Sequence, residues 1–293
     1  MRLLVSLLAA SLLPTLAWAA TPVNDTHTVA AGGRVELTNV AGAITVRGWD
    51  RNEVQLTGTL GDGLTLKQEK SANRVRWEVQ YPRRQQSNGD GRLELRVPRR
   101  ALEVQLGSVS ADVTVSAVDV RRLQINTVSG AVSAAGRSGE SVIMTVSGDI
   151  DAQLRTPRLE ARTVSGAVQA GGGVGGELTL ASVSGRVGVD AAQVQRLAVE
   201  TVSGNVDLAA SGLAPGGSIT VQAVSAPVSL RLPKQVSAKL SVNSFSGAIS
   251  SDAGRAVRSP HGVGSALETR LGSGDGDIRL ESHSGNVRVR LDR

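Results

Sequence analysis

One motif recurs along most of the chain and limits the folds that are open to it. The motif reads apolar-x-apolar-x-Thr/Ser-Val-Ser-Gly-x-Val, and one complete copy runs from Leu123 to Val132. Self-similarity at a nearly fixed period, here mostly 18 or 19 residues, is the sequence signature of a protein built from stacked repeats. The glycines of the repeat are Gly130, Gly148, Gly166, Gly185, Gly204, Gly247 and Gly285.

Each copy of the repeat predicts two short β-strands joined at the glycine. Leu123 and Ile125 alternate with polar residues, and the phase slips after Gly130, so that Val132 continues the buried set. Glycine permits a bend at that corner. The period is too short to contain a crossover helix, so neighbouring copies must pair directly and in parallel. We therefore expect an all-β fold: a right-handed parallel β-solenoid of about nine to ten coils with an N-terminal β cap region.

The repeat spacing also suggests an order of stacking. Read in chain order, each coil follows the one before it, and the interval of 38 residues between Gly247 and Gly285 is twice 19. We expect a distorted extra copy around Gly274 or Gly276 within that interval.

The chain divides into three predicted segments. Residues 1–19 are expected to be a secretory signal peptide, because a short apolar run follows Arg2 and Ala17-Trp18-Ala19 supplies a cleavage site. No stretch reaches the roughly 20 apolar residues of a membrane span. Residues 20–105 lack the Ser-Gly period and are predicted to begin the sheet and cap it, and residues 106–293 to form the solenoid. The mature protein is then expected to be exported, and periplasmic, extracellular or associated with the cell surface.

Composition argues against several kinds of site. The chain has no cysteine, so it has no disulfide, thiolate metal site or cysteine nucleophile. His27, His261 and His283 are far apart in sequence and do not have the spacing of a metal site. The stretch 272–278 looks like one fragment of a calcium-binding roll, but a roll needs several stacked copies. We expect no cofactor and no metal ion.

An enzyme is the main rival class, because solenoids also carry polysaccharide lyases and hydrolases. Asp151 and Asp207 share one predicted outer row, but about 14 Å of strand spacing separates them, too far for an acid–base pair. The hydroxyls before each Val-Ser-Gly have no neighbouring histidine or acid, so they are interpreted as partners of backbone groups at the corner. We expect no catalytic residue. The hydroxyl residues are Thr127, Thr145, Thr163, Ser182, Thr201 and Ser244.

The charge pattern suggests a partner. The formal net charge is +6, which favours anionic lipids or acidic polysaccharides, and export argues against nucleic acid. Paired arginines suit the geometry of phosphate and carboxylate groups. A solvated surface without a partner is the alternative interpretation. The candidate binding residues are Arg83, Arg84, Arg99, Arg100, Arg121 and Arg122.

Three segments and the repeats resemble a known family. The stretch Val46-Arg-Gly-Trp-Asp-Arg-Asn-Glu-Val54 is similar to an early segment of the DUF4097 adhesin-like proteins. Leu95-Arg-Val-Pro98, residues 102–110 and the Ser-Gly repeats continue the resemblance over nearly all of the mature chain. The resemblance implies a β-solenoid of envelope-associated proteins and offers no catalytic residues.

These observations lead to one expected function with two alternatives. We expect an exported, non-enzymatic, adhesin-like β-solenoid that binds or scaffolds at the bacterial cell envelope, where its partner is an envelope component or another protein. The first alternative is an electrostatic binder of anionic envelope lipid or polysaccharide. The second is a polysaccharide-active β-helix enzyme.

Overall fold

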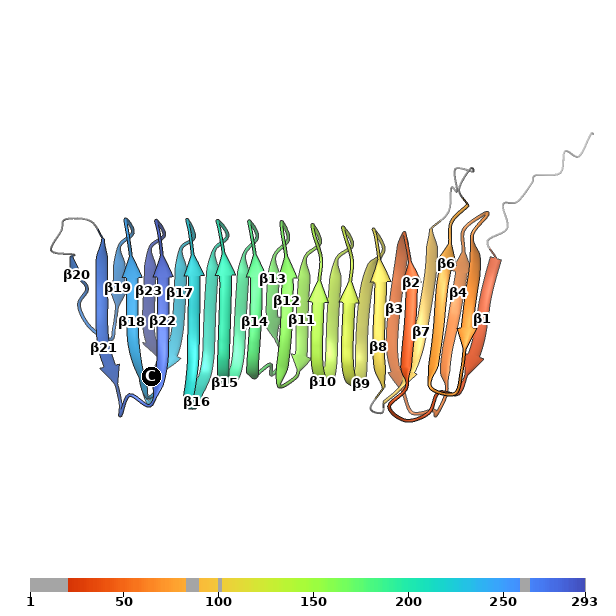
Figure 1. The fold of residues 1–293 in the computed structure, drawn as a ribbon, viewed down its shortest axis with the longest axis horizontal. Coiled ribbons are helices and arrows are strands. Elements are labelled where there is room, and N and C mark those ends of the chain that lie inside the picture. The colour runs from red at the N-terminus through yellow and green to blue at the C-terminus, as the bar shows by residue number, and fades with distance from the viewer. Residues whose placement is uncertain (1–20, 83–89, 100–101, 259–263, 293) are drawn as a thin grey trace, which may run out of the picture.

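The computed structural model describes residues 21–82, 90–99, 102–258 and 264–292. In these ranges the chain forms 23 β-strands and no helix. Figure 1 shows the strands side by side in one long row, with the N-terminal strands at one end and the C-terminal strands at the other. The expected all-β class and the parallel pairing of the repeats are confirmed.

The strands fall into three groups along the chain. The first group is β1 (Thr21–His27), β2 (Arg34–Asn39), β3 (Gly42–Trp49), β4 (Val54–Leu60), β5 (Thr65–Lys70), β6 (Arg74–Gln80), β7 (Gly91–Pro98) and β8 (Glu103–Ser108). The second is β9 (Asp112–Asn126), β10 (Val132–Met144), β11 (Ile150–Arg155), β12 (Arg158–Thr163), β13 (Val168–Gly171), β14 (Gly176–Ser182), β15 (Val187–Thr201) and β16 (Val206–Ala223). The third is β17 (Val228–Pro233), β18 (Ala238–Ser244), β19 (Ile249–Ser251), β20 (Val257–Arg258), β21 (Ser265–Leu271), β22 (Gly276–Ser282) and β23 (Val287–Asp292).

Each repeat contributes one layer, made of a strand before the Val-Ser-Gly turn and a strand after it. The strands before the turn pair with one another, as β12 does with β14, where Leu159 lies opposite Leu178. The strands after the turn pair separately, as β11 does with β13, where Ile150 lies opposite Val168. We call these two sides of the layers the pre-turn face and the post-turn face.

Apolar side chains from the two faces form one continuous core. Leu123 and Ile125 on the pre-turn face and Val132 and Ala134 on the post-turn face are all at most 2% exposed. Successive side chains of a strand point to opposite sides, so Ser133, between Val132 and Ala134, is exposed. The same positions are apolar in layer after layer, and burying each large aliphatic side chain contributes about 1.5–3 kcal/mol to folding.

The C-terminal layers do not stack in chain order. Strand β22 lies between β16 and β18, so that Leu280 is opposite Val221 on one side and Val242 on the other. Strand β23 lies in the same way between β17 and β19. The last repeat of the chain is therefore inserted between the two repeats that precede it. The expectation of simple chain order is wrong here.

The reason for the insertion lies in the connection between these repeats. After β19 the chain returns as β21, which pairs antiparallel with β18 and occupies its outer side, with Leu267 opposite Val242. The only side of β18 left for β22 is the inner one. The extra copy expected around Gly274 or Gly276 is also not found: Gly272 and Gly274, with φ of 56° and 78°, form the turn from β21, and Gly276 begins β22.

The N-terminal end has a similar arrangement. Strand β2 lies between β6 and β8, where Leu37 is opposite both Trp77 and Leu106. Strand β3 lies between β7 and β9. Beyond these layers, β4 pairs antiparallel with β7, β1 with β4, and β5 with β6. Antiparallel strands thus cover the outer sides of β6 and β7, as β21 covers that of β18, and β1 and β5 become the edge strands at the N-terminal end.

The repeat glycines are required by close approach between layers. None of the seven has a positive φ, so the bend that we expected them to permit is not the reason for their presence. A Cβ on Gly166 would instead overlap the carbonyl oxygen of Gly148, and a Cβ on Gly185 would overlap that of Gly166. The same holds for the others, each against the corresponding residue of the adjacent layer. A side chain at any of these seven glycines would push two layers apart.

The hydroxyl column fixes the same turn. The Thr163 hydroxyl accepts a hydrogen bond from the Gly166 N–H at 3.1 Å and donates one to the Gly148 carbonyl at 3.3 Å. All six hydroxyls accept from the glycine N–H three residues later, at 2.9–3.3 Å. The predicted role as partners of backbone groups at the corner is confirmed.

Candidate binding groove beside the Val-Ser-Gly turns

The valine of each Val-Ser-Gly turn is exposed. Because the turn interrupts the strand alternation, its first residue points into solvent, and the side chains in this row, His283 apart, are 43–53% exposed. They form an apolar edge that follows the tips of the layers, which we call the turn ridge. In order along the row it consists of Val109, Val128, Val146, Val164, Val183, Val202, Val224, His283 and Phe245.

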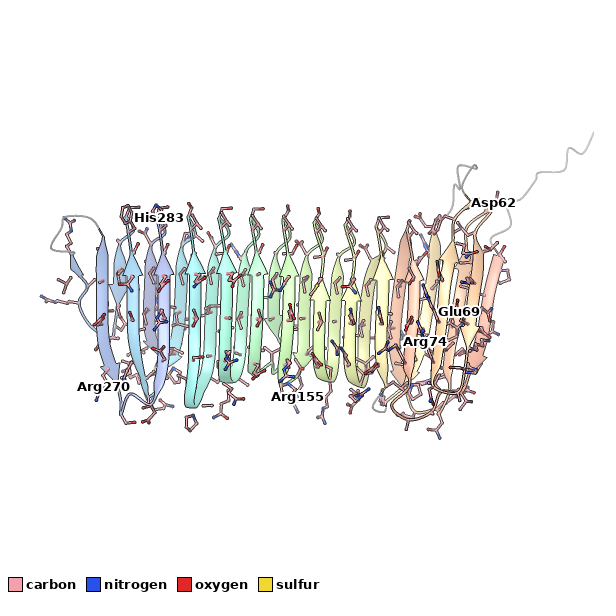
Figure 2. The ribbon with its side chains drawn as sticks, in the orientation of Figure 1. Asp62, Glu69, Arg74, Arg155, Arg270 and His283 are labelled. Atoms are coloured by element: carbon pink, nitrogen blue, oxygen red, sulfur yellow. The ribbon has the colours of Figure 1, made fainter. Side chains whose placement is uncertain are left out.

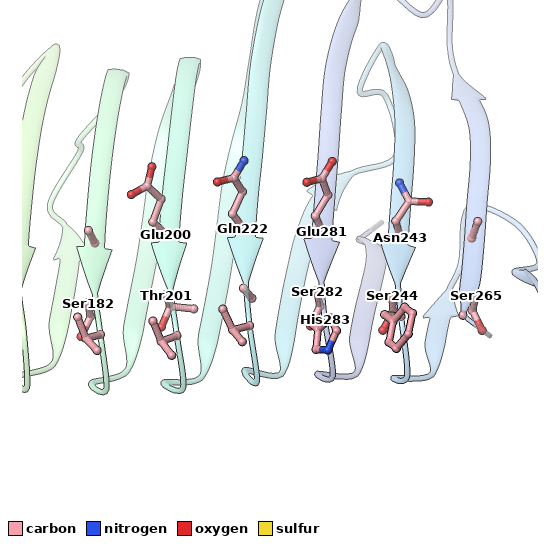
Figure 3. A pocket seen from close by; sticks show the side chains of 18 of the residues that line it. Ser182, Glu200, Thr201, Gln222, Asn243, Ser244, Ser265, Glu281, Ser282 and His283 are labelled. Atoms are coloured by element: carbon pink, nitrogen blue, oxygen red, sulfur yellow. The ribbon is translucent and has the colours of Figure 1, made fainter. Parts of the chain in front are cut away.

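A groove of about 920 Å³ runs beside the C-terminal half of the turn ridge, on the pre-turn face. It forms because the residue directly before each ridge residue is small and points inward, as Ser182, Thr201 and Ala223 do. The ridge is one wall of the groove. The other wall is made by the outward side chains two positions before the ridge (Figure 3).

That second wall is a row of carboxylates and amides. Glu200, Gln222, Glu281 and Asn243 lie on the neighbouring strands β15, β16, β22 and β18, in register with one another. Figure 3 shows the four side chains extending from successive strands above the line of hydroxyls. Insertion of the last repeat places Glu281 between Gln222 and Asn243. The row therefore exists only in the stacked protein and not in the linear sequence.

Two rings stack on the ridge at the end of the groove. Phe245 and His283 lie face to face, with centroids 4.8 Å apart and planes inclined by 6°. Phe245 is the only phenylalanine of the chain. The pair presents a flat apolar surface beside the polar row, a combination suited to a partner that has both apolar faces and hydrogen-bonding groups.

The hydroxyls of Ser244 and Ser282 in the groove are occupied by the turns. Ser244 accepts a hydrogen bond from the Gly247 N–H at 2.9 Å and donates to the Gly285 carbonyl at 3.2 Å. Ser282 accepts from the Gly285 N–H at 2.8 Å. Neither serine has a histidine nitrogen as its partner, so neither is arranged as an activated nucleophile.

The groove is acidic. Among the described residues that line it, Glu200 and Glu281 are carboxylates and none is lysine or arginine. The two glutamates are two strands apart, about 10 Å at parallel spacing. A neutral or cationic partner therefore fits the groove better than an anionic one.

The arginines predicted from sequence lie elsewhere. Arg83, Arg84 and Arg100 are outside the described residues. Arg99 lies 3.3 Å from the Asp50 carboxylate and donates to the Ala117 carbonyl. Arg121 pairs with Glu103, and Arg122 lies 3.6 Å from Glu140. The three arginines that can be placed therefore each face a carboxylate of the protein itself, and none lines the groove.

The other candidate groups are also separated. Asp151, Gln169, Gly188 and Asp207 follow one another in register, so the two aspartates are three strands apart. No cluster of three or more potential metal-binding side chains occurs within the described ranges. His283 is a corner residue of the turn ridge and occupies the position that is valine in most other copies of the repeat (Figure 2). Nowhere in the described chain is there a helix of the length and apolarity that a bilayer span needs.

The structure explains why glycine and tryptophan stand at positions 48 and 49, in the segment that resembles the family. A Cβ on Gly48 would overlap the carbonyl oxygen of Ala117, which has a left-handed backbone with φ of 53°. The Trp49 indole donates to the Glu53 carbonyl at 2.8 Å, and the Arg51 guanidinium lies 5.1 Å from its ring centroid. The segment thus closes a corner where the first layers meet.

Comparison with protein families agrees with this segment and with the repeats. The family model Toastrack DUF4097 matches residues 28–290. The chain belongs to this family. The DUF4097 match includes both the N-terminal segment and the Ser-Gly repeats, so the resemblance inferred from the sequence is confirmed.

Solved structures with a related fold include two from Parabacteroides distasonis. One, named a "putative adhesin", has a TM-score of 0.54 at 9% identity, over 93% of this chain and 98% of that one. The other, named a "putative lipid binding protein", has a TM-score of 0.52 at 13% identity, over 91% of this chain and 96% of that one. At such identities the likeness concerns the fold. No curated protein matches the sequence.

The sequence did not point to the groove. Its polar wall depends on which layers are neighbours, and the ridge depends on the valine that breaks the alternation. That valine was a usable signal, because an apolar residue at a solvent-facing corner in copy after copy has no packing role of its own.

Proposed function

We propose that this DUF4097 protein is an exported, non-enzymatic rod that binds or scaffolds at the bacterial cell envelope through the groove beside the turn ridge. In this proposal the stacked layers are the coils of a β-solenoid, about nine to ten of them, with antiparallel strands as caps. A rod of this kind presents an extended side to its partner, and repeat proteins commonly bind in that way.

The observation that carries the proposal is the groove itself. It joins a polar row, an aromatic pair and an apolar ridge on consecutive rigid strands, so that one extended partner can contact several layers at once. The names of the two Parabacteroides distasonis structures, "putative adhesin" and "putative lipid binding protein", agree with a binding role. The acidity of the groove favours a neutral or cationic partner over an anionic surface.

An enzyme is less well supported. Ser182, Ser244 and Ser282 in the groove are hydrogen-bonded within the turns. Glu200 and Glu281 are about 10 Å apart at parallel spacing, well beyond the roughly 5–5.5 Å of a retaining glycosidase and slightly beyond the roughly 6.5–9.5 Å of an inverting one. Export rests on the N-terminal segment. Mass spectrometry of the protein from its native host should find a mature form that begins at Ala20, and retention of Met1 would contradict export.

The binding role is tested by co-sedimentation of residues 20–293 with the insoluble cell-wall fraction of the producing bacterium. Phe245→Ser and Glu200→Gln/Glu281→Gln should each reduce the bound fraction severalfold. Glu160→Gln makes the same chemical change on the same face outside the groove and should leave binding unchanged. Equal binding by all variants would contradict the groove. Release of sugar fragments that Glu281→Gln abolishes would instead support an enzyme.

A further inference from the structure

An arginine-lined hollow of about 610 Å³ opens on the post-turn face, across the core from the groove. Strands β15, β16, β17 and β23 form it, and its floor contains the small residues Gly188, Ala209 and Ser229. Small residues in the middle of otherwise long outward side chains leave a depression in the sheet surface.

Three of the four arginines that line the hollow lie on two neighbouring strands. Arg231 in β17 lies directly opposite Arg290 in β23, and Arg288 lies two residues before Arg290 on the same side of β23. Arg186 lines the edge nearer the turns. Within the described part of the chain none of these four arginines forms an ion pair.

Such an arrangement is unfavourable without a partner. Like charges directly opposite on neighbouring strands destabilise a sheet, and parallel strands are only about 4.8 Å apart. Arg99, Arg121 and Arg122 each have a carboxylate beside them, whereas Arg231 and Arg290 have each other. Guanidinium groups gathered over an open depression are suited to an anion that several of them bind together.

The hollow also has an acceptor side. Asp207 lies in register between Gly188 and Ser229, and Asp190 lies two residues after Gly188. Asp190 and Asp207 lie beside the arginines in the lining of the same hollow, and their carboxylates can accept hydrogen bonds from hydroxyl groups of a ligand. None of the exposed large apolar side chains of the described residues lines the hollow, so it offers no contact for an acyl chain.

We propose that this hollow binds a sugar unit that carries a carboxylate, as part of an acidic polysaccharide. Arg231, Arg288 and Arg290 bind the carboxylate, and Asp190 and Asp207 accept from the sugar hydroxyls. The inference rests on the proposed role at the envelope, where such polymers occur, but not on the groove, because no residue lines both sites.

The test is calorimetric titration of residues 20–293 with an oligosaccharide of galacturonic acid, beside a neutral galactose oligosaccharide of equal length. Arg231→Gln/Arg290→Gln should weaken galacturonate binding at least tenfold. Arg196→Gln/Arg255→Gln removes the same charge outside the hollow and should leave binding unchanged. Equal loss in the two double variants, or no galacturonate binding by the unmodified protein, would overturn the proposal.

Asp207→Asn separates recognition from simple attraction. It removes a negative charge, so attraction between net charges alone predicts tighter galacturonate binding, whereas the proposal predicts weaker binding. Inorganic phosphate and vesicles of phosphatidylethanolamine and phosphatidylglycerol are titrated in parallel. Binding of either more tightly than galacturonate would identify a phosphate site and overturn the sugar assignment.

Stability provides a second readout. Without ligand, Arg231→Gln should unfold at an equal or higher urea concentration than the unmodified protein, because a like-charge pair is removed. A lower midpoint would show that the arginine serves folding and would overturn the site.

Phe245→Ser should retain galacturonate binding. If the hollow fails this test while cell-wall binding still depends on Phe245, the proposed function stands without this inference.

Discussion

Phe245 and His283 stack with ring centroids 4.8 Å apart, although 38 residues separate them in the sequence. They meet because the last repeat is inserted between two earlier ones, which places β22 against β18. The same insertion places Glu281 beside Gln222. The candidate groove is thus a product of the order of the layers as much as of the residues in them.

Engineered cross-links can test that order, because the chain has no cysteine of its own. Val224→Cys/His283→Cys and His283→Cys/Phe245→Cys each join turns that follow adjacent strands and are hydrogen-bonded to each other. Both pairs should oxidise to disulfides, since a disulfide spans Cα atoms about 4.4–6.8 Å apart. Val224→Cys/Phe245→Cys spans two strand spacings and should stay reduced. Gel mobility with and without reductant measures each. Efficient linkage of 224 to 245 would restore chain order and contradict the insertion.

Gly166, in the middle of the rod, should not tolerate even one methyl group. Gly166→Ala places a Cβ against the Gly148 carbonyl, so we expect a loss of about 2–3 kcal/mol in the free energy of unfolding. Gly212→Ala is the matched control, because nothing lies within 4 Å of its added Cβ and its φ is not positive. Urea denaturation followed by circular dichroism compares the two. Coincident midpoints would mean that the layers can separate without cost.

The hydroxyl column should contribute through its two hydrogen bonds. Thr163→Val keeps the shape of the side chain but leaves the Gly166 N–H without its acceptor, which should cost about 1–3 kcal/mol. Thr114→Val makes the same change on an exposed strand position and should have little effect. The check is the difference between the thermal unfolding midpoints of the two variants. If Thr163→Val unfolds at the same temperature as the unmodified protein, the turn geometry depends on the glycines alone.

The single tyrosine offers a pH-dependent readout. Burial raises the pKa of Tyr81, whose hydroxyl donates to the Asn39 side chain and accepts from the Ala41 N–H. A raised pKa in the folded state means that this contribution to stability is complete below the unfolded value of about 10 and is lost as pH rises through the higher folded value. Tyrosinate absorbance should therefore titrate at higher pH in the native protein than in urea. Identical midpoints would place Tyr81 in solvent.

The sequence contained most of the information about the layers. Alternation around Leu123 and Ile125 predicts which side chains are buried, because strand periodicity and burial are directly linked. The position of Gly166 was predicted correctly but its reason was not, since close approach between layers is a property of the stack and is not visible in one copy of the repeat.

The layer order and the groove could not be read from spacing. An interval of 38 residues is compatible with two coils stacked one after the other. It is equally compatible with one antiparallel strand that returns along the outside, followed by a repeat inserted between earlier ones. The antiparallel strand β21 decides between the two arrangements. Arg231 and Arg290 belong to repeats that are 59 residues apart and become neighbours through the same insertion. The arginine pairs adjacent in sequence were easier to notice than this pair.

The inserted last repeat also bears on how the protein is made. A nascent chain presents its layers to one another in order of synthesis, and each can dock on its predecessor as it emerges. The layer that contains β18 is different, because its inner neighbours β22 and β23 are synthesised after it. Until β22 and β23 have been made, β18 can pair only with β21 on its outer side, and its inner side lacks the neighbour that it has in the folded protein. Truncation before β22 would therefore leave an open sheet edge inside the rod and not at its tip.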